Sequence, residues 1–154
     1  MKRTSEEVRT EMHEVKDQWF NEWNKEGKIP SWDYRDKENE IYVEWLQSLE
    51  VGDHAHIRHY SDITPCTVIK RTATTITVRN DTARKSDKWN PQWITGGFVA
   101  HCINNEYQDD WWICEEDPHG TEEIFRWRKK SRSWMNTCDE RLYPEWKYHY
   151  DYNF

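Results

Sequence analysis

Three histidines lie close together in the sequence, at positions 54, 56 and 59, and could bind a metal ion. In a strand, His54 and His56 would project from the same face, whereas His59 would point the other way. Only Asp53 and Asp62 lie near enough to act as further local ligands, so a metal site would need distant residues. The pattern therefore favours exposed histidines on a polar sheet face. We assign no metal ligand and no cofactor, and a metal-dependent hydrolase that uses His54 or His56 remains an alternative.

Other side-chain combinations do not specify an enzyme. His101 and Cys102 could pair as a base and a nucleophile, but adjacent residues of a strand face opposite sides of the sheet. The sequence also lacks a phosphate-binding glycine loop, a Gly-x-Ser-x-Gly motif and a zinc-protease helix motif. Paired acids are frequent in the last third, and such charge runs are usually solvated. We assign no catalytic residue and favour a protein that is not an enzyme.

A basic and aromatic set of residues is the stronger candidate for a binding site. Arg126 and Arg128 are expected on one strand face, opposite Phe125 and Trp127. Positive grooves with stacking aromatic side chains bind single-stranded nucleic acids or nucleotides. The alternative is that the cations pair with neighbouring acids and the tryptophans belong to the core. The candidate binding residues are Arg58, Arg79, Trp89, Trp93, Trp111, Trp112, Arg126 and Arg128.

Charge is distributed unevenly along the 154 residues. Residues 51–103 carry seven Lys/Arg and four Asp/Glu, a net charge of +3, whereas residues 1–50 and 104–154 each carry −5. The overall charge of −7 argues against nucleic-acid affinity of the whole surface, although a local patch can still bind phosphates. We expect a cationic outer side on the middle segment and anionic neighbours.

The composition indicates a compact protein of the cytoplasm. Hydrophobic residues make up only 35% of the chain, but eleven Trp, eight Tyr and four Phe can supply the buried area that the aliphatic residues do not. No apolar run has the length of a membrane span, and the first residues lack an apolar signal core. The four cysteines have no Cys-x-x-Cys spacing, which favours reduced thiols.

The first 50 residues are expected to form a helical pair. Thr4 and Glu7 form a capping-box signature, and Gly27 is a suitable residue to end the first helix. Between them an apolar stripe recurs at helical spacing and is expected to face the core. A second helix is expected over residues 34–49. The pair would form a hairpin or lie across a sheet, with a separate partner-binding arm as the alternative for the first helix. The residues of the stripe are Val8, Met12, Val15, Trp19 and Trp23.

Residues 51–154 are expected to form an antiparallel β domain. Strands are predicted at about 54–60, 66–71 and 74–80, with Ile57, Ile76 and Val78 facing inward. Residues 81–95 are expected to form a polar loop, followed by strands at 98–103 and 111–116, a turn at 117–120 and a strand containing Phe125. The aromatic C-terminal segment is expected to pack as a final strand or extended segment. The fold class is therefore α+β, a helical pair followed by a small SH3-like bent β-barrel.

From residue 51 to the end, an ordered set of short motifs resembles a group of small tailed-phage and prophage proteins. The resemblance implies a phage origin and a related fold, but no particular activity. The chain departs from the group at residues 104–107 and 109–112, where the group is richer in Gly and Arg. The motifs are Val51-Gly52-Asp53, Ser61-Asp62, Thr67-Val68-Ile69-Lys70-Arg71-Thr72, Thr75-Ile76-Thr77-Val78, Asp81-Thr82-Ala83, Gly96-Gly97-Phe98, His101, Asp117-Pro118-His119-Gly120, Phe125 to Arg128, Trp134 and Tyr150-Asp151-Tyr152-Asn153-Phe154.

Together these patterns lead to three hypotheses. The first is a non-enzymatic phage accessory protein that binds a host protein in the host cytoplasm and inhibits a defence or nucleic-acid-processing system. Its acidic segments would imitate a phosphate backbone, and an aromatic patch would supply the binding hot spot. The second is a nucleic-acid or nucleotide-binding module that uses the basic and aromatic sheet face. The third is the metal-dependent hydrolase. No membrane partner is expected.

Overall fold

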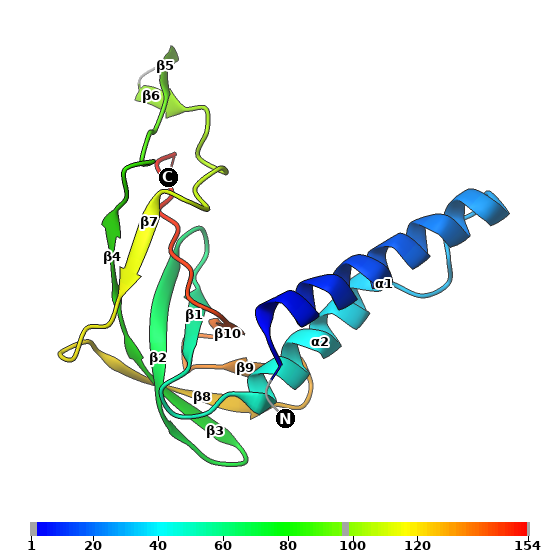
Figure 1. Cartoon of the computed structure of the whole chain (residues 1–154), viewed down its shortest axis with the longest axis horizontal. Coiled ribbons are helices and arrows are strands. Elements are labelled where there is room, and N and C mark those ends of the chain that lie inside the picture. Colours follow the sequence, from blue (N-terminus) through cyan, green and yellow to red (C-terminus); the bar gives the residue numbers. More distant parts are fainter. Residues whose placement is uncertain (1–2, 97–98, 154) are drawn as a thin grey trace. The chain divides into compact units, whose positions relative to one another are not determined.

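The computed structural model describes residues 3–96 and 99–153 of the chain. Contacts within the chain divide it into two compact units, Met1–Leu49 and Glu50–Phe154. The helices belong to the first unit and the strands to the second (Figure 1). The predicted α+β class, a helical pair followed by a small antiparallel β-barrel, is confirmed.

The first unit is a helical hairpin. Helix α1 (Ser5–Glu26) begins at the predicted capping box, in which the Glu7 N–H donates to Thr4 Oγ1 at 3.2 Å and the Thr4 N–H donates to the Glu7 carboxylate at 3.0 Å. It ends at Gly27, whose φ of 69° is easy for a residue without a Cβ. Helix α2 (Tyr34–Ser48) returns antiparallel to α1 and contacts it (Figure 1). Within the described residues, neither helix has the length and apolar character needed to cross a membrane.

The predicted apolar stripe of α1 is buried at one end only. Val8 is buried, but Trp23 is 39% exposed, as is the neighbouring Phe20 at 38%. The prediction that the whole stripe faces the core is therefore wrong at its C-terminal end. The physical reason is that this end of the hairpin is closed by residues 27–33, a link too short to supply a second layer of side chains. On α2 the buried residues are Ile41, Trp45 and Leu46.

The second unit contains a closed six-stranded barrel in the order β1-β10-β9-β8-β3-β2, and its neighbouring strands are antiparallel. Each strand pairs with the barrel strand next to it in the chain, and β10 closes the ring on β1. The barrel is thus an up-and-down meander with one long insertion between β3 and β8 (Figure 1). Its strands are β1 (His54–Arg58), β2 (Ile63–Arg71), β3 (Thr75–Asn80), β8 (Glu122–Arg128), β9 (Ser133–Met135) and β10 (Arg141–Pro144).

Alternate residues of these strands fill the barrel. Ile57, Ile76 and Val78 are fully buried, as their alternation with polar residues predicted. Apolar burial of this kind is the main favourable term in folding, so these positions define the core of the unit. The other fully or nearly fully buried apolar residues of the strands are Ala55, Cys66, Val68, Phe125, Trp134 and Leu142.

The insertion forms an arm, which we define as residues 82–115. Strand β4 (Thr82–Lys85) pairs with β7 (Trp112–Glu115), and β5 (Trp93–Gly96) pairs with β6 (Val99–Cys102). The predicted polar loop over residues 81–95 is therefore wrong, because it contains two strands. Strand β6 matches the strand expected at 98–103, and Phe98 lies outside the described residues.

Two residues fix the junction of the arm and the barrel. The buried Asp81 carboxylate accepts hydrogen bonds from Thr67 Oγ1 at 2.6 Å, from Trp146 Nε1 at 3.0 Å and from the Asp117 N–H at 3.0 Å. Gly120 lies so near the chain that a Cβ there would overlap the Asn80 carbonyl oxygen. The predicted turn at 117–120 is thus confirmed, since the Gly120 N–H donates to the Asp117 carbonyl at 3.1 Å.

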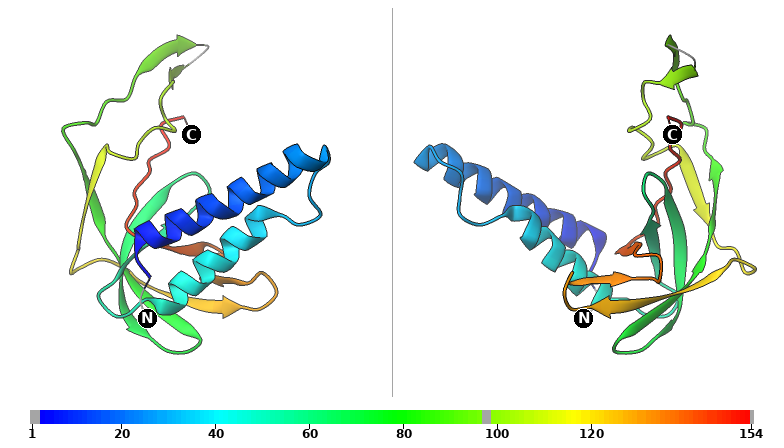
Figure 2. Two further views of the ribbon diagram at one scale, coloured as in Figure 1. Left: turned by 45° about the vertical axis from the view of Figure 1, so that its right-hand side comes forward. Right: turned by 180° about the vertical axis from the view of Figure 1, so that it is seen from behind.

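The chain ends in a segment that we call the tail, residues 145–153. It is extended after β10 and runs alongside the arm (Figures 1 and 2). His149 forms an isolated antiparallel bridge with Ile63 at the start of β2. The prediction that this aromatic segment packs as an extended element is confirmed for the tail.

Candidate functional site

The four tryptophans predicted to bind nucleic acid lie along the arm, and three of them contact one tail residue, Tyr152. The Trp89 Nε1–H donates to the Tyr152 hydroxyl at 2.9 Å. The rings of Trp93 and Trp111 lie 5.7 Å and 6.3 Å from the Tyr152 ring, in edge-to-face arrangements. Trp111 is buried, whereas Trp93 remains 48% exposed. These three tryptophans are therefore engaged in contacts with the tail.

The fourth tryptophan, Trp112, is held by an amide that also binds the tail. Its Nε1–H donates to Gln108 Oε1 at 2.9 Å, and its ring contacts Tyr148 at 4.6 Å. The buried Gln108 side chain also donates to the Tyr150 carbonyl at 2.7 Å and accepts from the Tyr150 N–H at 3.2 Å. Asn153 makes the equivalent pair of bonds to the backbone of Cys102, at 2.8 Å and 2.9 Å. Side-chain amides, Gln108 from the arm and Asn153 from the tail, thus join the two segments with the paired bonds that a neighbouring strand would make.

The predicted arginines lie on the barrel, away from the strands of the arm. Arg79 is on β3, directly opposite Glu122 of β8. Arg128 donates to Asp139 Oδ1 at 3.0 Å and to the Asn136 carbonyl at 3.1 Å. Arg126 is exposed on β8 and has no ion-pair partner in the described part of the chain. The structure therefore separates the eight predicted residues into two groups instead of one basic and aromatic face.

Strand pairing brings together arginines that are far apart in the sequence. Arg58 of β1 lies directly opposite Arg141 of β10, and Arg141 lies opposite Met135 of β9, which in turn lies opposite Arg126 of β8. We call Arg58, Arg141 and Arg126 the arginine row. Sequence reasoning missed Arg141, because only the pairing of β10 with β1 and β9 reveals its position. The alternation with buried Leu142 was the one available signal that it faces outward.

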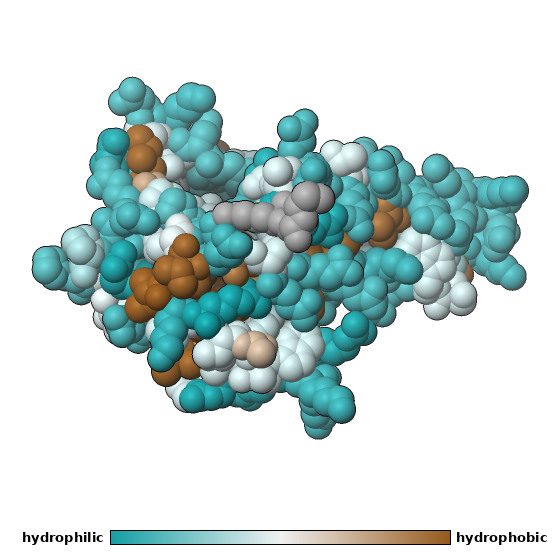
Figure 3. Space-filling view, turned by 60° about the horizontal axis from the view of Figure 1, so that its bottom comes forward, coloured by the Kyte–Doolittle hydropathy of each residue, from teal (hydrophilic) through white to brown (hydrophobic). Residues whose placement is uncertain are grey.

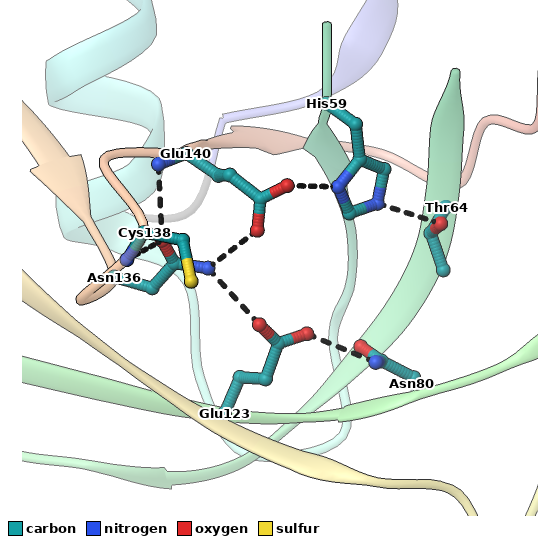
Figure 4. A network of polar contacts seen from close by, with 7 residues as sticks. All are labelled: His59, Thr64, Asn80, Glu123, Asn136, Cys138 and Glu140. Carbon is teal, nitrogen blue, oxygen red and sulfur yellow. Dashed lines mark hydrogen bonds and ion pairs between the residues drawn. The ribbon is translucent and has the colours of Figure 1, made fainter.

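A network of polar side chains links three parts of the barrel (Figure 4). His59 Nδ1 contacts Glu140 Oε2, and His59 Nε2 lies 2.9 Å from Thr64 Oγ1. Asn136 Nδ2 donates to Glu140 at 2.9 Å and to Glu123 at 3.0 Å. Burial would raise the pKa of Glu140, but the hydrogen bonds from Asn136 and His59 outweigh it and lower that pKa below its usual value.

The same network has the order of groups that activates a hydroxyl, since the imidazole of His59 lies between a carboxylate and Thr64. Its other bonds are structural. Asn80 also donates to Glu123, at 2.9 Å, and Asn136 Oδ1 accepts from the Glu140 N–H at 3.0 Å. Each carboxylate is thus held by at least two bonds from different segments. We interpret the network as one that stabilises the barrel by linking its segments.

A polar pocket of about 370 Å³ lies between the turn after β1, the arm and the tail. His59 lines it, but Thr64 and Glu140 do not, so the pocket reaches only one member of the hydroxyl–imidazole–carboxylate series. Both charge signs meet in it. The charged side chains that line it are Arg58, Asp62, Glu106, Asp109, Lys147 and Asp151.

A second pocket, of about 390 Å³, lies at the end of the helical hairpin, and we call it the tip pocket. Trp19 is at its centre, with the rings of Phe20, Trp23 and Tyr34 at 5.0 Å, 5.4 Å and 5.3 Å. Three apolar side chains remain exposed there, Phe20 at 38%, Trp23 at 39% and Ile29 at 66%. The face in Figure 3 is mostly hydrophilic and carries several separate hydrophobic groups.

The histidines considered as metal ligands are used in packing. The His54 ring stacks on Trp146 with the ring centroids 3.4 Å apart, and its Nε2 lies 3.3 Å from Glu116. His56 is buried, and its Nδ1 donates to the Glu145 carbonyl at 2.9 Å. Among the residues that the structure describes, no three His, Cys, Asp or Glu side chains are grouped so that they could hold a metal ion.

Comparisons with known proteins give no relative for this chain. No family model, no curated protein and no solved structure matches it.

Proposed function

We propose that this protein is a non-enzymatic phage accessory protein that binds a host protein in the host cytoplasm, and that the tip pocket is the centre of that interaction. Its most concrete form is inhibition of a host defence or nucleic-acid-processing system. The observation that supports the proposal is the cluster of partly exposed aromatic side chains at the end of an otherwise polar hairpin. Trp and Tyr are the residues that most often carry the binding energy of protein interfaces.

The tip pocket is held in shape before any partner binds. The Trp19 Nε1–H donates to the Trp32 carbonyl at 2.8 Å, and the Trp32 Nε1–H donates to Glu22 at 2.7 Å. These two bonds fix the link of residues 27–33 against α1. A preformed aromatic surface loses less conformational entropy on binding than a flexible one, which favours affinity for a protein partner.

The net charge of the helical unit favours a positively charged partner. Residues 1–49 carry eight Lys/Arg and twelve Asp/Glu, a net charge of −4, so the unit that bears the tip pocket is acidic. An acidic unit attracts a positively charged protein over a distance and can imitate the charge of a nucleic acid. A host enzyme that processes nucleic acids has such a basic surface, which is the reason for the concrete form of the proposal.

Capture of a partner from host-cell lysate tests the proposal. We expect the wild-type protein to retain one host polypeptide and the Phe20→Ser/Trp23→Ser variant to lose it. Removing a hot-spot aromatic costs about 2 kcal/mol or more, so the Kd measured with the isolated partner should rise by about 30-fold or more.

The matched control is Trp93→Ser, which removes a tryptophan that is 48% exposed but lies on the arm of the other unit. This variant should retain the polypeptide with unchanged affinity. Equal loss in both variants would show that general stickiness of tryptophan causes the capture. Capture that survives Phe20→Ser/Trp23→Ser would refute the role of the tip pocket.

A further inference from the structure

The geometry points to a second binding site, on the barrel: the arginine row binds the phosphodiester backbone of a nucleic acid. This inference goes beyond the proposed function, since it concerns another unit and another class of ligand. It rests on the positions that strand pairing gives to Arg58, Arg141 and Arg126 and on the charges around them.

The three arginines lie on the outside of four successive strands. Buried Ile57 and Leu142 adjoin Arg58 and Arg141 in the chain, and buried Phe125 adjoins Arg126, so the arginine at each position faces away from the core. The row runs β1, β10, β9, β8, and Met135 fills the β9 position. With strands about 4.8 Å apart, the row spans about 14 Å, the axial length of about four successive phosphates on one strand.

The row keeps like charges together, and in the described residues no carboxylate forms an ion pair with any of its arginines, although Arg58 also lines the polar pocket that holds Asp62, Glu106, Asp109 and Asp151. Arg58 and Arg141 are directly opposite one another, an arrangement that destabilises a sheet. The Arg58 guanidinium lies 4.2 Å from the centre of the Tyr143 ring, which supports it without cancelling its charge. Arg126 and Arg141 are both exposed, and in residues 3–96 and 99–153 neither has a carboxylate at ion-pair distance.

Several other cations of this unit differ from the row in that they are paired with carboxylates. Arg84 on the arm pairs with Glu115, Lys88 lies 3.8 Å from Asp110, and Arg128 is bonded to Asp139. The barrel surface around Arg126 instead carries further exposed cations, Lys129 and Lys130, in the turn between β8 and β9. Arginines that repel one another and form no ion pairs make the fold less stable. Binding of an anion would explain why they lie together.

Phosphodiester groups match the chemistry of the row. A guanidinium is always charged and presents paired N–H donors that fit the oxygens of a phosphate. The outside of a small barrel is convex, and a flexible single strand follows such a surface more easily than a duplex, whose persistence length is about 50 nm. We therefore expect tighter binding of single strands.

Fluorescence anisotropy with labelled single-stranded DNA, the same sequence as duplex DNA, and single-stranded RNA tests the inference. At low salt the wild-type protein should bind both single strands more tightly than the duplex. Arg126→Gln and Arg141→Gln should each weaken binding by about tenfold, because a charged hydrogen-bonding partner of the phosphate is lost. The double variant should also reduce the slope of log Kd against log salt by about 1.4, or about 0.7 for each lost phosphate contact.

Two controls separate this role from a structural one. Arg84→Gln removes a cation that is already paired and should leave binding unchanged. Arg141→Gln should raise the melting temperature while it weakens binding, because it relieves repulsion from Arg58. The inference is overturned if no oligonucleotide binds at low salt, if the double variant binds like the wild type, or if vesicles containing phosphatidylserine bind in place of nucleic acid. If the duplex bound more tightly than the single strand, the expectation that a flexible strand follows the convex barrel surface would be refuted.

Discussion

His56 is a titratable side chain whose position on a strand did not predict its surroundings. It alternates with the inward residues Ala55 and Ile57, yet only 5% of it is exposed. The Tyr143 ring stacks on it with centroids 5.6 Å apart, and its Nε2 has no hydrogen-bond partner in the described part of the protein. Burial disfavours the charged imidazolium and, with smaller effects of nearby Arg58 and Lys147, lowers the pKa of His56 to about 4.

This shift predicts that acid destabilises the fold before most carboxylates titrate. Between pH 6.5 and about 4 the unfolded chain binds a proton at His56 and the folded chain does not. The free energy of unfolding should therefore fall as the pH falls through this window, by about 3 kcal/mol in total. Urea unfolding at a series of pH values measures this. His56→Asn removes the titrating group and keeps a donor near the Nδ1 position, so its stability should vary less with pH across the window. An unchanged slope in this variant would contradict the assignment to His56.

Residue types alone could predict part of the arginine row. Alternation with buried neighbours indicated that Arg58 and Arg126 face outward, and both positions are exposed. Alternation with buried Leu142 could have indicated that Arg141 faces outward, but not that it joins the row, because its neighbours there come from β1 and β9, and β1 is far away in the sequence. The same limit hid the contact between His59 and Glu140, two residues that are 81 positions apart.

At the scale of elements, the arm depends on the tail. Each of its two ribbons has only two strands, and a two-stranded ribbon is marginally stable in water. The tail adds aromatic contacts and the amide bonds of Gln108 and Asn153 along one side of the ribbons. We infer that the arm is ordered by the tail more than by its own strand pairing.

Gln108→Leu tests this dependence. The change removes the partners of the Trp112 Nε1–H and of the Tyr150 N–H and carbonyl, which are part-buried groups, so each loss should cost less than the penalty of about 1–3 kcal/mol for a fully buried group. We expect amide hydrogen exchange in residues 82–115 and 146–153 to become much faster, while the exchange of the barrel strands changes little. Gln92→Leu, at an exposed position of the arm, is the control. Exchange that rises equally in barrel and arm would show that the tail stabilises the whole unit instead.

Elements differed in how well the sequence predicted them. The first helix was predicted because capping residues and a long apolar stripe mark it, and its ends agree with Thr4 and Gly27. The second was predicted over residues 34–49 and is observed over Tyr34–Ser48, with Asp33 as its N-cap. Two strands of the arm, β6 and β7, were predicted, but β4 and β5 were not, since both are exposed along most of their length and show no alternation of buried and exposed residues. A ribbon without a core face has no periodic signal in its sequence.

At the scale of the whole molecule, two segments of opposite net charge build one barrel. The middle segment, with its net +3, supplies the adjacent strands β1, β2 and β3, and the last segment, with its net −5, supplies the adjacent strands β8, β9 and β10. Residues 50–154 together carry fourteen Lys/Arg and seventeen Asp/Glu, a net charge of −3. The expected cationic outer side of the middle segment therefore stays a prediction. The arginine row draws on both segments, because Arg58 comes from the middle one and Arg126 and Arg141 come from the last.

The division into two units makes the two proposed binding activities separable. The tip pocket belongs to residues 1–49 and the arginine row to residues 50–154, and the two sites share no residue. Phe20→Ser/Trp23→Ser should therefore abolish partner capture and leave the Kd for single-stranded DNA unchanged. Arg126→Gln/Arg141→Gln should do the reverse. Effects of independent sites add, so the variant with all four changes should show both losses with the magnitudes of its parents. Anisotropy with and without the captured partner measures this. If either double variant lost both partner capture and DNA binding, one surface would serve both ligands, because independent sites on separate units cannot produce that result.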